Sequence, residues 1–168
     1  MKDDNQTSEY TIKRVGALLH KIIPIVDGAG RIVQYVAKPL RVELRRRDIM
    51  QIIVGASVLA IPVGFTEEAW RLGERLPLLN VIMLGVVSIA FIAAFVYFNF
   101  YRELFRPYRS EYVKRVIAIY LLSLLTVGIL LTIIEVAPWG VDDLLAIKRI
   151  IIVTFPASMS AAVSDAIK

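Results

Sequence analysis

The sequence predicts an all-α, polytopic membrane protein with about four transmembrane helices and an N-terminal amphipathic helix. Of its 168 residues, 57% are hydrophobic and only 21% are charged, and the mean hydropathy is +0.64. Soluble domains are about 45–50% apolar. A chain of this length needs less apolar material than this for a water-soluble core. We therefore expect the excess apolar surface to face lipid.

Four apolar runs predict the spans. The hydrocarbon core of a bilayer is about 30 Å thick, so a spanning helix needs about 20 apolar residues. Residues 49–66, 77–101 and 116–134 meet this length with almost no charge. Residues 144–163 form a weaker candidate, because Lys148 and Arg149 lie near its start and a shorter run is also typical of a re-entrant or interfacial segment. Its small residues recur at four-residue spacing, which allows close helix packing in lipid, and we expect it to span.

The chain divides into a basic, cytoplasmic helical region at 1–48 and a transmembrane domain at 49–168. Apolar residues between Ile12 and Val26 follow a helical stripe. This pattern favours an amphipathic helix on an anionic lipid surface. A helix packed against the other helices or against a neighbouring subunit is an equal alternative. Asp27-Gly28-Ala29-Gly30 predicts a turn, and Pro39 interrupts the stretch that leads into the first span.

The distribution of Lys and Arg predicts the orientation. Residues 1–48 hold ten of them and residues 102–115 hold five, whereas residues 67–76 hold two and residues 135–143 hold none. Basic flanks remain in the cytoplasm. We therefore expect a multi-pass protein of the inner or plasma membrane with both termini cytoplasmic and the acidic connections outside.

The composition excludes several kinds of site. The chain has no cysteine, which excludes thiolate metal ligands and a cysteine nucleophile. Its one histidine, His20, excludes a multi-histidine metal centre. We therefore expect no enzymatic activity and no cofactor. The positive-inside rule already explains the basic flanks, so we expect no nucleic-acid partner; the expected partners are membrane lipid and further copies of the chain.

The first span has an ordered charge pattern. Arg45, Arg46 and Arg47 precede it, and Glu67 and Glu68 follow it. Repeated around a symmetry axis, such a helix makes a pore with a basic inner end, an apolar constriction and an outer carboxylate ring that selects and binds a cation. The pore-lining candidates are Ile49, Ile53, Ala56, Ser57, Ala60, Val63 and Gly64. The competing interpretation is that these charges are ordinary interfacial residues at the two helix ends.

Further charges fall on the predicted outer side. They are Glu135, Asp142, Asp143, Lys148 and Arg149. Ionisable residues at membrane depth usually pair or line a cavity. We expect the two basic residues either to pair with these three acids, the nearest in sequence, or to extend to the outer interface.

Two segments carry a resemblance to a known family. Gly55…Ile61-Pro62…Thr66-Glu67-Glu68-Ala69-Trp70 and Ile147-Lys148-Arg149-Ile150…Phe155-Pro156-Ala157-Ser158-Met159-Ser160-Ala161 resemble a family of prokaryotic integral membrane proteins of unknown function. The resemblance covers about residues 43–168 and implies a small, four-helix membrane protein without implying an activity. In layout alone, the chain is also similar to store-operated calcium channels, whose first helix runs from basic residues to a glutamate ring.

Two functions follow as hypotheses. The first is an oligomeric cation channel whose first transmembrane helix lines the pore, with Glu67 and Glu68 forming the outer ring. The alternative is a non-transporting scaffold or accessory subunit of a membrane complex, which the absence of any acid near the bilayer midplane favours.

Overall fold

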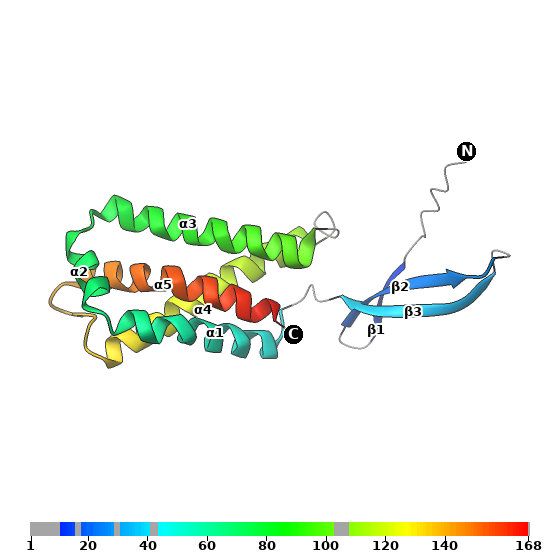
Figure 1. The fold of residues 1–168 in the computed structure, drawn as a ribbon, viewed down its shortest axis with the longest axis horizontal. Coiled ribbons are helices and arrows are strands. Elements are labelled where there is room, and N and C mark those ends of the chain that lie inside the picture. The colour runs from blue at the N-terminus through cyan, green and yellow to red at the C-terminus, as the bar shows by residue number, and fades with distance from the viewer. Residues whose placement is uncertain (1–10, 16–17, 29–30, 41–43, 103–107, 168) are drawn as a thin grey trace. The chain divides into compact units, whose positions relative to one another are not determined.

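A computed structural model describes residues 11–15, 18–28, 31–40, 44–102 and 108–167. The chain divides into two compact units, Met1–Val42 and Glu43–Lys168. The first unit contains strands and the second contains helices (Figure 1).

The first unit is a three-stranded antiparallel sheet in the order β1-β2-β3. Its strands are β1 (Thr11–Val15), β2 (Leu18–Val26) and β3 (Ile32–Leu40). The predicted turn at Asp27 is confirmed: the Asp27 amide donates to the Arg31 carbonyl over 2.9 Å and its carboxylate accepts from the Arg31 amide over 2.9 Å.

The predicted N-terminal amphipathic helix is therefore wrong. The segment is rich in β-branched residues, which fit a pleated sheet better than a helix. Pro24 also lies inside β2, at a position where a helix would lose a backbone hydrogen bond. Apolar residues do recur at helical spacing in this segment, but so short a pattern does not outweigh the β-branched residues and Pro24.

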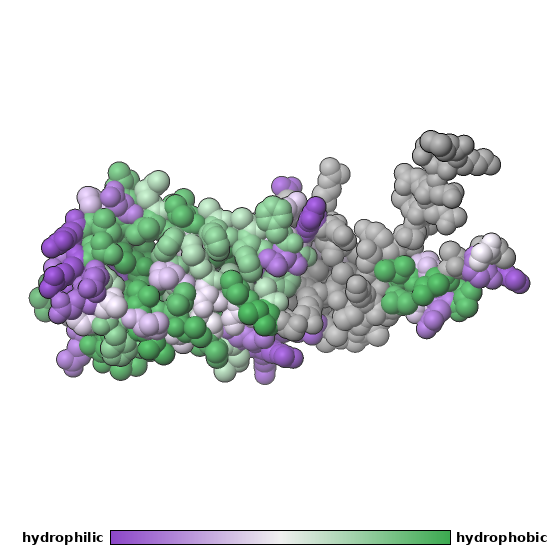
Figure 2. All heavy atoms as spheres, viewed as in Figure 1, coloured by the Kyte–Doolittle hydropathy of each residue, from purple (hydrophilic) through white to green (hydrophobic). Residues whose placement is uncertain are grey.

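The second unit contains the four predicted spans. Its elements are α1 (Arg46–Gly64), α2 (Glu67–Arg75), α3 (Leu78–Val96), a π-helical turn η1 (Tyr97–Tyr101), α4 (Arg109–Ile133) and α5 (Asp143–Ala166). In the part of the chain that the structure describes, four helices are long and apolar enough to cross a membrane: α1, α3 with η1, α4 and α5. Within this unit an apolar band separates two polar ends (Figure 2), as a spanning protein requires.

Helix α5 lies at the centre of this unit and contacts α1, α2, α3 and α4 (Figure 1). Its small residues Ala157, Ser158, Ala161 and Ala162 are buried, which confirms the close packing expected from their spacing. Gly55 of α1 faces α5 so closely that a Cβ atom there would lie 3.0 Å from the Ala161 Cα and would overlap Ser164. The glycine therefore sets how near α1 approaches α5.

The short helix α2 was not predicted. Thr66 occupies its N-cap position and Glu67 and Glu68 its first turn, where carboxylates are favoured by the helix dipole. The Trp70 indole donates to the Gly64 carbonyl over 2.8 Å. That bond uses a carbonyl left free by the end of α1 and fixes α2 beside it.

Candidate functional site

The predicted carboxylate ring does not continue the face of α1. The helix ends at Gly64, and Glu67 and Glu68 begin α2 beyond a turn. The two glutamates therefore do not extend the helix that was expected to line the pore. Both glutamates are exposed, and Glu67 forms an ion pair of 2.9 Å with Arg71 one turn along α2.

The predicted pore face of α1 is divided between the chain's interior and its surface. Ala56, Ala60 and Gly64 are buried within this one chain. Ile49, Ile53, Ser57 and Val63 are half-buried. Beyond Arg46 and Arg47, the large side chains that α1 exposes are apolar: Met50, Val54, Val58, Leu59 and Ile61.

Most of the flanking charged residues lie at helix ends, where some of them accept hydrogen bonds from free backbone amides. Arg45, Arg46 and Arg47 are exposed at the start of α1. The Asp142 carboxylate caps α5 by accepting from the Leu145 amide over 2.9 Å, and Asp143 accepts from the Gly140 amide over 2.7 Å. Glu135 is exposed in the turn after α4, at a φ of 59°.

A buried ionic cluster, formed by Arg115, Asp48 and Asp165, lies where α1 begins and α5 ends. We call this end of the bundle the Arg115 end. The Arg115 side chain is fully buried in α4. Its Nε and Nη2 donate to the two carboxylate oxygens of Asp165 over 2.8 and 3.1 Å, and Nη2 also lies 3.4 Å from Oδ2 of Asp48. The arginine therefore binds one carboxylate through both arms of its guanidinium and reaches a second.

Asp48 links this cluster to the first turn of α1. Its Oδ2 accepts from the Arg45 amide over 3.1 Å as well as from Arg115. One carboxylate thus satisfies a free amide at the helix start and a buried guanidinium. The cluster therefore holds the start of α1, the first half of α4 and the end of α5 together.

Aromatic rings cover the same guanidinium. Phe100 lies over it, with 4.2 Å between the ring centroid and the Arg115 Cζ. The fully buried Tyr101 meets the Tyr112 ring edge-on at 5.4 Å. Phe100 and Tyr101 both come from η1, so this aromatic turn covers the cluster.

The cluster is suited to holding helices. A buried charge without its partner costs about 3–5 kcal/mol, so each helix that carries a partner is held in register. Among the described residues no group of three or more His, Cys, Asp and Glu could hold a metal ion. The cluster thus connects three helices, α1, α4 and α5, that are far apart in sequence.

Sequence reasoning missed this cluster, although a signal existed. Asp48, Arg115 and Asp165 each border an apolar run on the side predicted to be cytoplasmic. Two acids beside apolar runs at a basic end need a cationic partner at the same depth. The charge count treated Arg115 as one more flanking residue.

Polar side chains near the middle of the bundle are satisfied inside the chain. Ser88 and Ser158 join α3 to α5 through hydroxyl oxygens 2.6 Å apart. Ser57, Ser123, Thr126 and Thr154 each donate to the carbonyl four residues earlier, over 2.7–2.9 Å. These hydroxyl groups therefore either join two helices or bond to the backbone of their own helix.

Arg149 closes the opposite end, which we call the Arg149 end. Its Nη1 donates to the Val136 carbonyl over 2.7 Å, its Nε to the Trp70 carbonyl over 3.3 Å, and its Nη2 forms an ion pair of 2.7 Å with Glu74. A Cβ on Gly73 would lie 2.6 Å from the Arg149 Cγ, so α2 can approach α5 here only because this position is glycine. The predicted pairing of Arg149 with the acids that flank α5 is wrong, because α2 folds back and supplies Glu74.

The sequence matches one protein family over residues 34–167, and that family is described as "Putative integral membrane protein (DUF2391)". No curated protein and no solved structure matches the chain.

Proposed function

Because the chain belongs to this family of integral membrane proteins, we propose that it is a non-transporting scaffold or accessory subunit of a membrane complex. The observation that carries the proposal is that polar side chains in the middle of the bundle bond within the chain, while α1 exposes apolar side chains. A conducting path needs polar groups or water along its wall. The proposal includes no catalytic step and no cofactor.

The strand unit is the part that we propose contacts a partner protein. On β3, Val33 and Tyr35 are exposed on one face, and Ile32 and Val36 on the other. Exposed apolar side chains that lie together on a surface are typical of protein interaction sites. By the positive-inside rule, the basic flanks favour a cytoplasmic location for this unit and for the Arg115 end.

A pull-down from native membranes with the full chain tests this role. We expect a stoichiometric partner, and we expect the double variant Val33→Lys, Tyr35→Lys to lose it, because two charges would be buried in the contact. Gln34→Lys is the matched control, since it adds a lysine at an exposed position on the other face of the same strand. Equal recovery of the partner with the double variant would contradict the role of this face.

The oligomeric cation channel is the second candidate, and one observation favours it. Glu67 and Glu68 are exposed at the end of the bundle that also carries Glu74, Asp142 and Asp143. Such an excess of carboxylates raises the local cation concentration. One copy has too few helices to enclose a path, so this function requires a symmetric homo-oligomer.

Cation flux into liposomes that contain only the purified protein separates the two functions. For a scaffold we expect no potassium, sodium or calcium flux above that of empty liposomes. Flux that loses its cation preference in the Glu67→Gln, Glu68→Gln double variant would overturn the scaffold and establish a channel with an outer acidic ring.

A further inference from the structure

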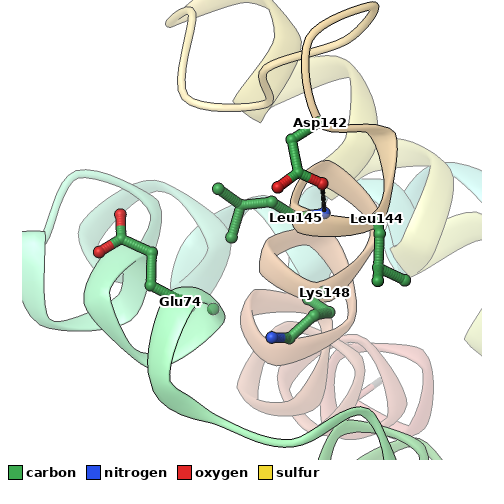
Figure 3. A pocket seen from close by; sticks show the side chains of 6 residues that line it. Glu74, Asp142, Leu144, Leu145 and Lys148 are labelled. Carbon is green, nitrogen blue, oxygen red and sulfur yellow. Dashed lines mark hydrogen bonds between the residues drawn. The ribbon is translucent and has the colours of Figure 1, made fainter.

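A hollow of about 260 Å³ lies at the Arg149 end, between α2 and the first turns of α5 (Figure 3). Its lining combines charges of both signs with apolar side chains. The lining residues are Gly73, Glu74, Asp142, Leu144, Leu145 and Lys148. Neither the scaffold nor the channel uses this hollow.

Lys148 provides the positive charge. Figure 3 shows its side chain extending from α5 on the side of α2. It is half-buried, and no carboxylate among the described residues forms an ion pair with it. Glu74 forms its ion pair with the neighbouring Arg149. Lys148 therefore lines the hollow with its hydrogen-bond donors available.

Two carboxylates provide the negative charge, each with one oxygen used inside the described part of the chain. One oxygen of Asp142 accepts from the Leu145 amide, and one oxygen of Glu74 binds Arg149. The other oxygen of Asp142 can accept from a ligand, whereas the Glu74 carboxylate extends from α2 away from Lys148 and Asp142 (Figure 3). A ligand that fills the hollow should therefore carry an anionic group for the lysine and an N–H cation for Asp142.

We expect the hollow to lie near the depth of the lipid headgroups. Lys148 is five residues into α5, or about 7.5 Å along its axis at the usual helical rise. The headgroup region adds about 5–7 Å to each side of the hydrocarbon core. Exposed apolar side chains lie in α2 and in the first turns of α3 and α5: Leu72, Leu78, Leu144 and Ile147.

We propose that this hollow binds the headgroup of a phospholipid of the phosphatidylethanolamine type. The Lys148 ammonium donates to the phosphate, and Asp142 accepts from the lipid's primary ammonium, both through charge-assisted hydrogen bonds. The acyl chains lie along the exposed apolar side chains of α2, α3 and α5. Phosphatidylcholine has no N–H to donate, and phosphatidylglycerol has no cation, so both bind more weakly.

Lipid binding to the purified full chain tests the proposal. The protein is delipidated in detergent and titrated with each of the three lipids, and bound lipid is counted by native mass spectrometry. We expect Lys148→Gln to weaken phosphatidylethanolamine binding about tenfold, since one charge-assisted contact is lost. Arg75→Gln is the matched control: it removes one charge from an exposed position of α2 that does not line the hollow. Equal binding by Lys148→Gln and the wild type would overturn the proposal.

Asp142→Asn tests the other half of the headgroup. Asparagine caps a helix as well as aspartate does, so α5 is retained while one negative charge is lost. We expect a smaller preference for phosphatidylethanolamine over phosphatidylglycerol. An unchanged preference, or no preference in the wild type, would overturn the choice of headgroup. Soluble glycerophosphoethanolamine binding as tightly as the lipid would overturn the assignment to lipid.

Discussion

An arginine closes each end of the helical unit, but the two arginines have different surroundings. At the Arg115 end the guanidinium is fully buried, and its partners are the buried carboxylates Asp48 and Asp165. At the Arg149 end the arginine side chain is 14% exposed, and it binds two backbone carbonyls and Glu74, whose side chain is 55% exposed.

This difference in burial indicates which end holds the helices rigidly together and which end is accessible to a ligand. Buried ion pairs are hardly screened by water or salt, and they cost several kcal/mol when one partner is removed. Exposed pairs contribute about 0–1 kcal/mol. The Arg115 end therefore holds three helices in register, whereas at the Arg149 end Lys148 and Asp142 can take up the proposed headgroup without loss of the fold.

The largest effect should come from Arg115→Met. It leaves Asp165 buried without the guanidinium that binds both of its oxygens and removes one cation from Asp48, so we expect the free energy of unfolding to fall by about 3–5 kcal/mol. Unfolding by SDS in mixed micelles measures this change. Lys114→Met is the matched control, since the Lys114–Glu111 pair is exposed and its loss should cost about 0–1 kcal/mol. A cost for Arg115→Met as small as that of the control would show that the cluster does not hold the helices.

The same cluster allows a rescue. Adding Asp165→Leu and Asp48→Asn to Arg115→Met removes the buried charges together, and asparagine keeps a side-chain oxygen for the start of α1. Replacing a whole buried ion cluster by uncharged residues is often neutral. We expect the triple variant to recover most of the lost stability in the same unfolding experiment. A triple variant less stable than the single one would contradict this explanation.

Gly55→Ala should have the next largest effect. Its Cβ would overlap Ser164, beside Asp165, and would push α1 away from α5 near the cluster. Overpacking of this kind costs about 1–3 kcal/mol. Gly128→Ala is the control, because its Cβ would meet only Ile150 Cδ1 at 3.9 Å. We expect the control to unfold at the same or slightly higher free energy, since alanine favours a helix by up to about 1 kcal/mol over glycine.

Arg149→Met tests the other end. It removes the donor to the Val136 carbonyl, and a buried acceptor without a partner costs about 1–3 kcal/mol. We expect a smaller loss of unfolding free energy than for Arg115→Met, because water can reach this end. A loss as large as that of Arg115→Met would remove the distinction between the two ends.

Glu74→Gln should have the smallest effect. The Glu74 carboxylate is more than half exposed, so its pair with Arg149 should contribute about 0–1 kcal/mol and less at high salt. Comparing the wild type and the variant at low and high salt checks this. A salt-independent loss above that range would mean that the pair is effectively buried.

The four spans were predictable because length and apolarity are local properties of the chain. The helix bounds were less predictable. The span was predicted at 116–134, but α4 begins at Arg109; its first two turns are polar, so hydropathy did not include them. By contrast, the start of α5 was predicted within one residue, at 144, and the helix begins at Asp143. The strand unit was mispredicted because its apolar residues fit two periodicities, and the local β preference prevailed.

The candidate site was less predictable than the fold. Glu67 and Glu68 were expected to extend α1, but the turn at residues 65–66 moves them to a separate helix. Ala56 and Ala60 were expected to line a pore, yet they are buried inside one chain. Helical periodicity shows which residues share a face, but it does not show what that face contacts.

The sequence by itself determined that this is a membrane protein with four spans, a turn at Asp27 and small residues along its last helix, because hydropathy, turn chemistry and side-chain size act over short stretches. Only the tertiary structure decided the partners of Arg115 and Arg149, and with them the difference between the two ends. Asp48, Arg115 and Asp165 are separated by 50 or more residues. Their pairing depends on which helices α5 packs between, and that choice follows from the fit of whole helix surfaces.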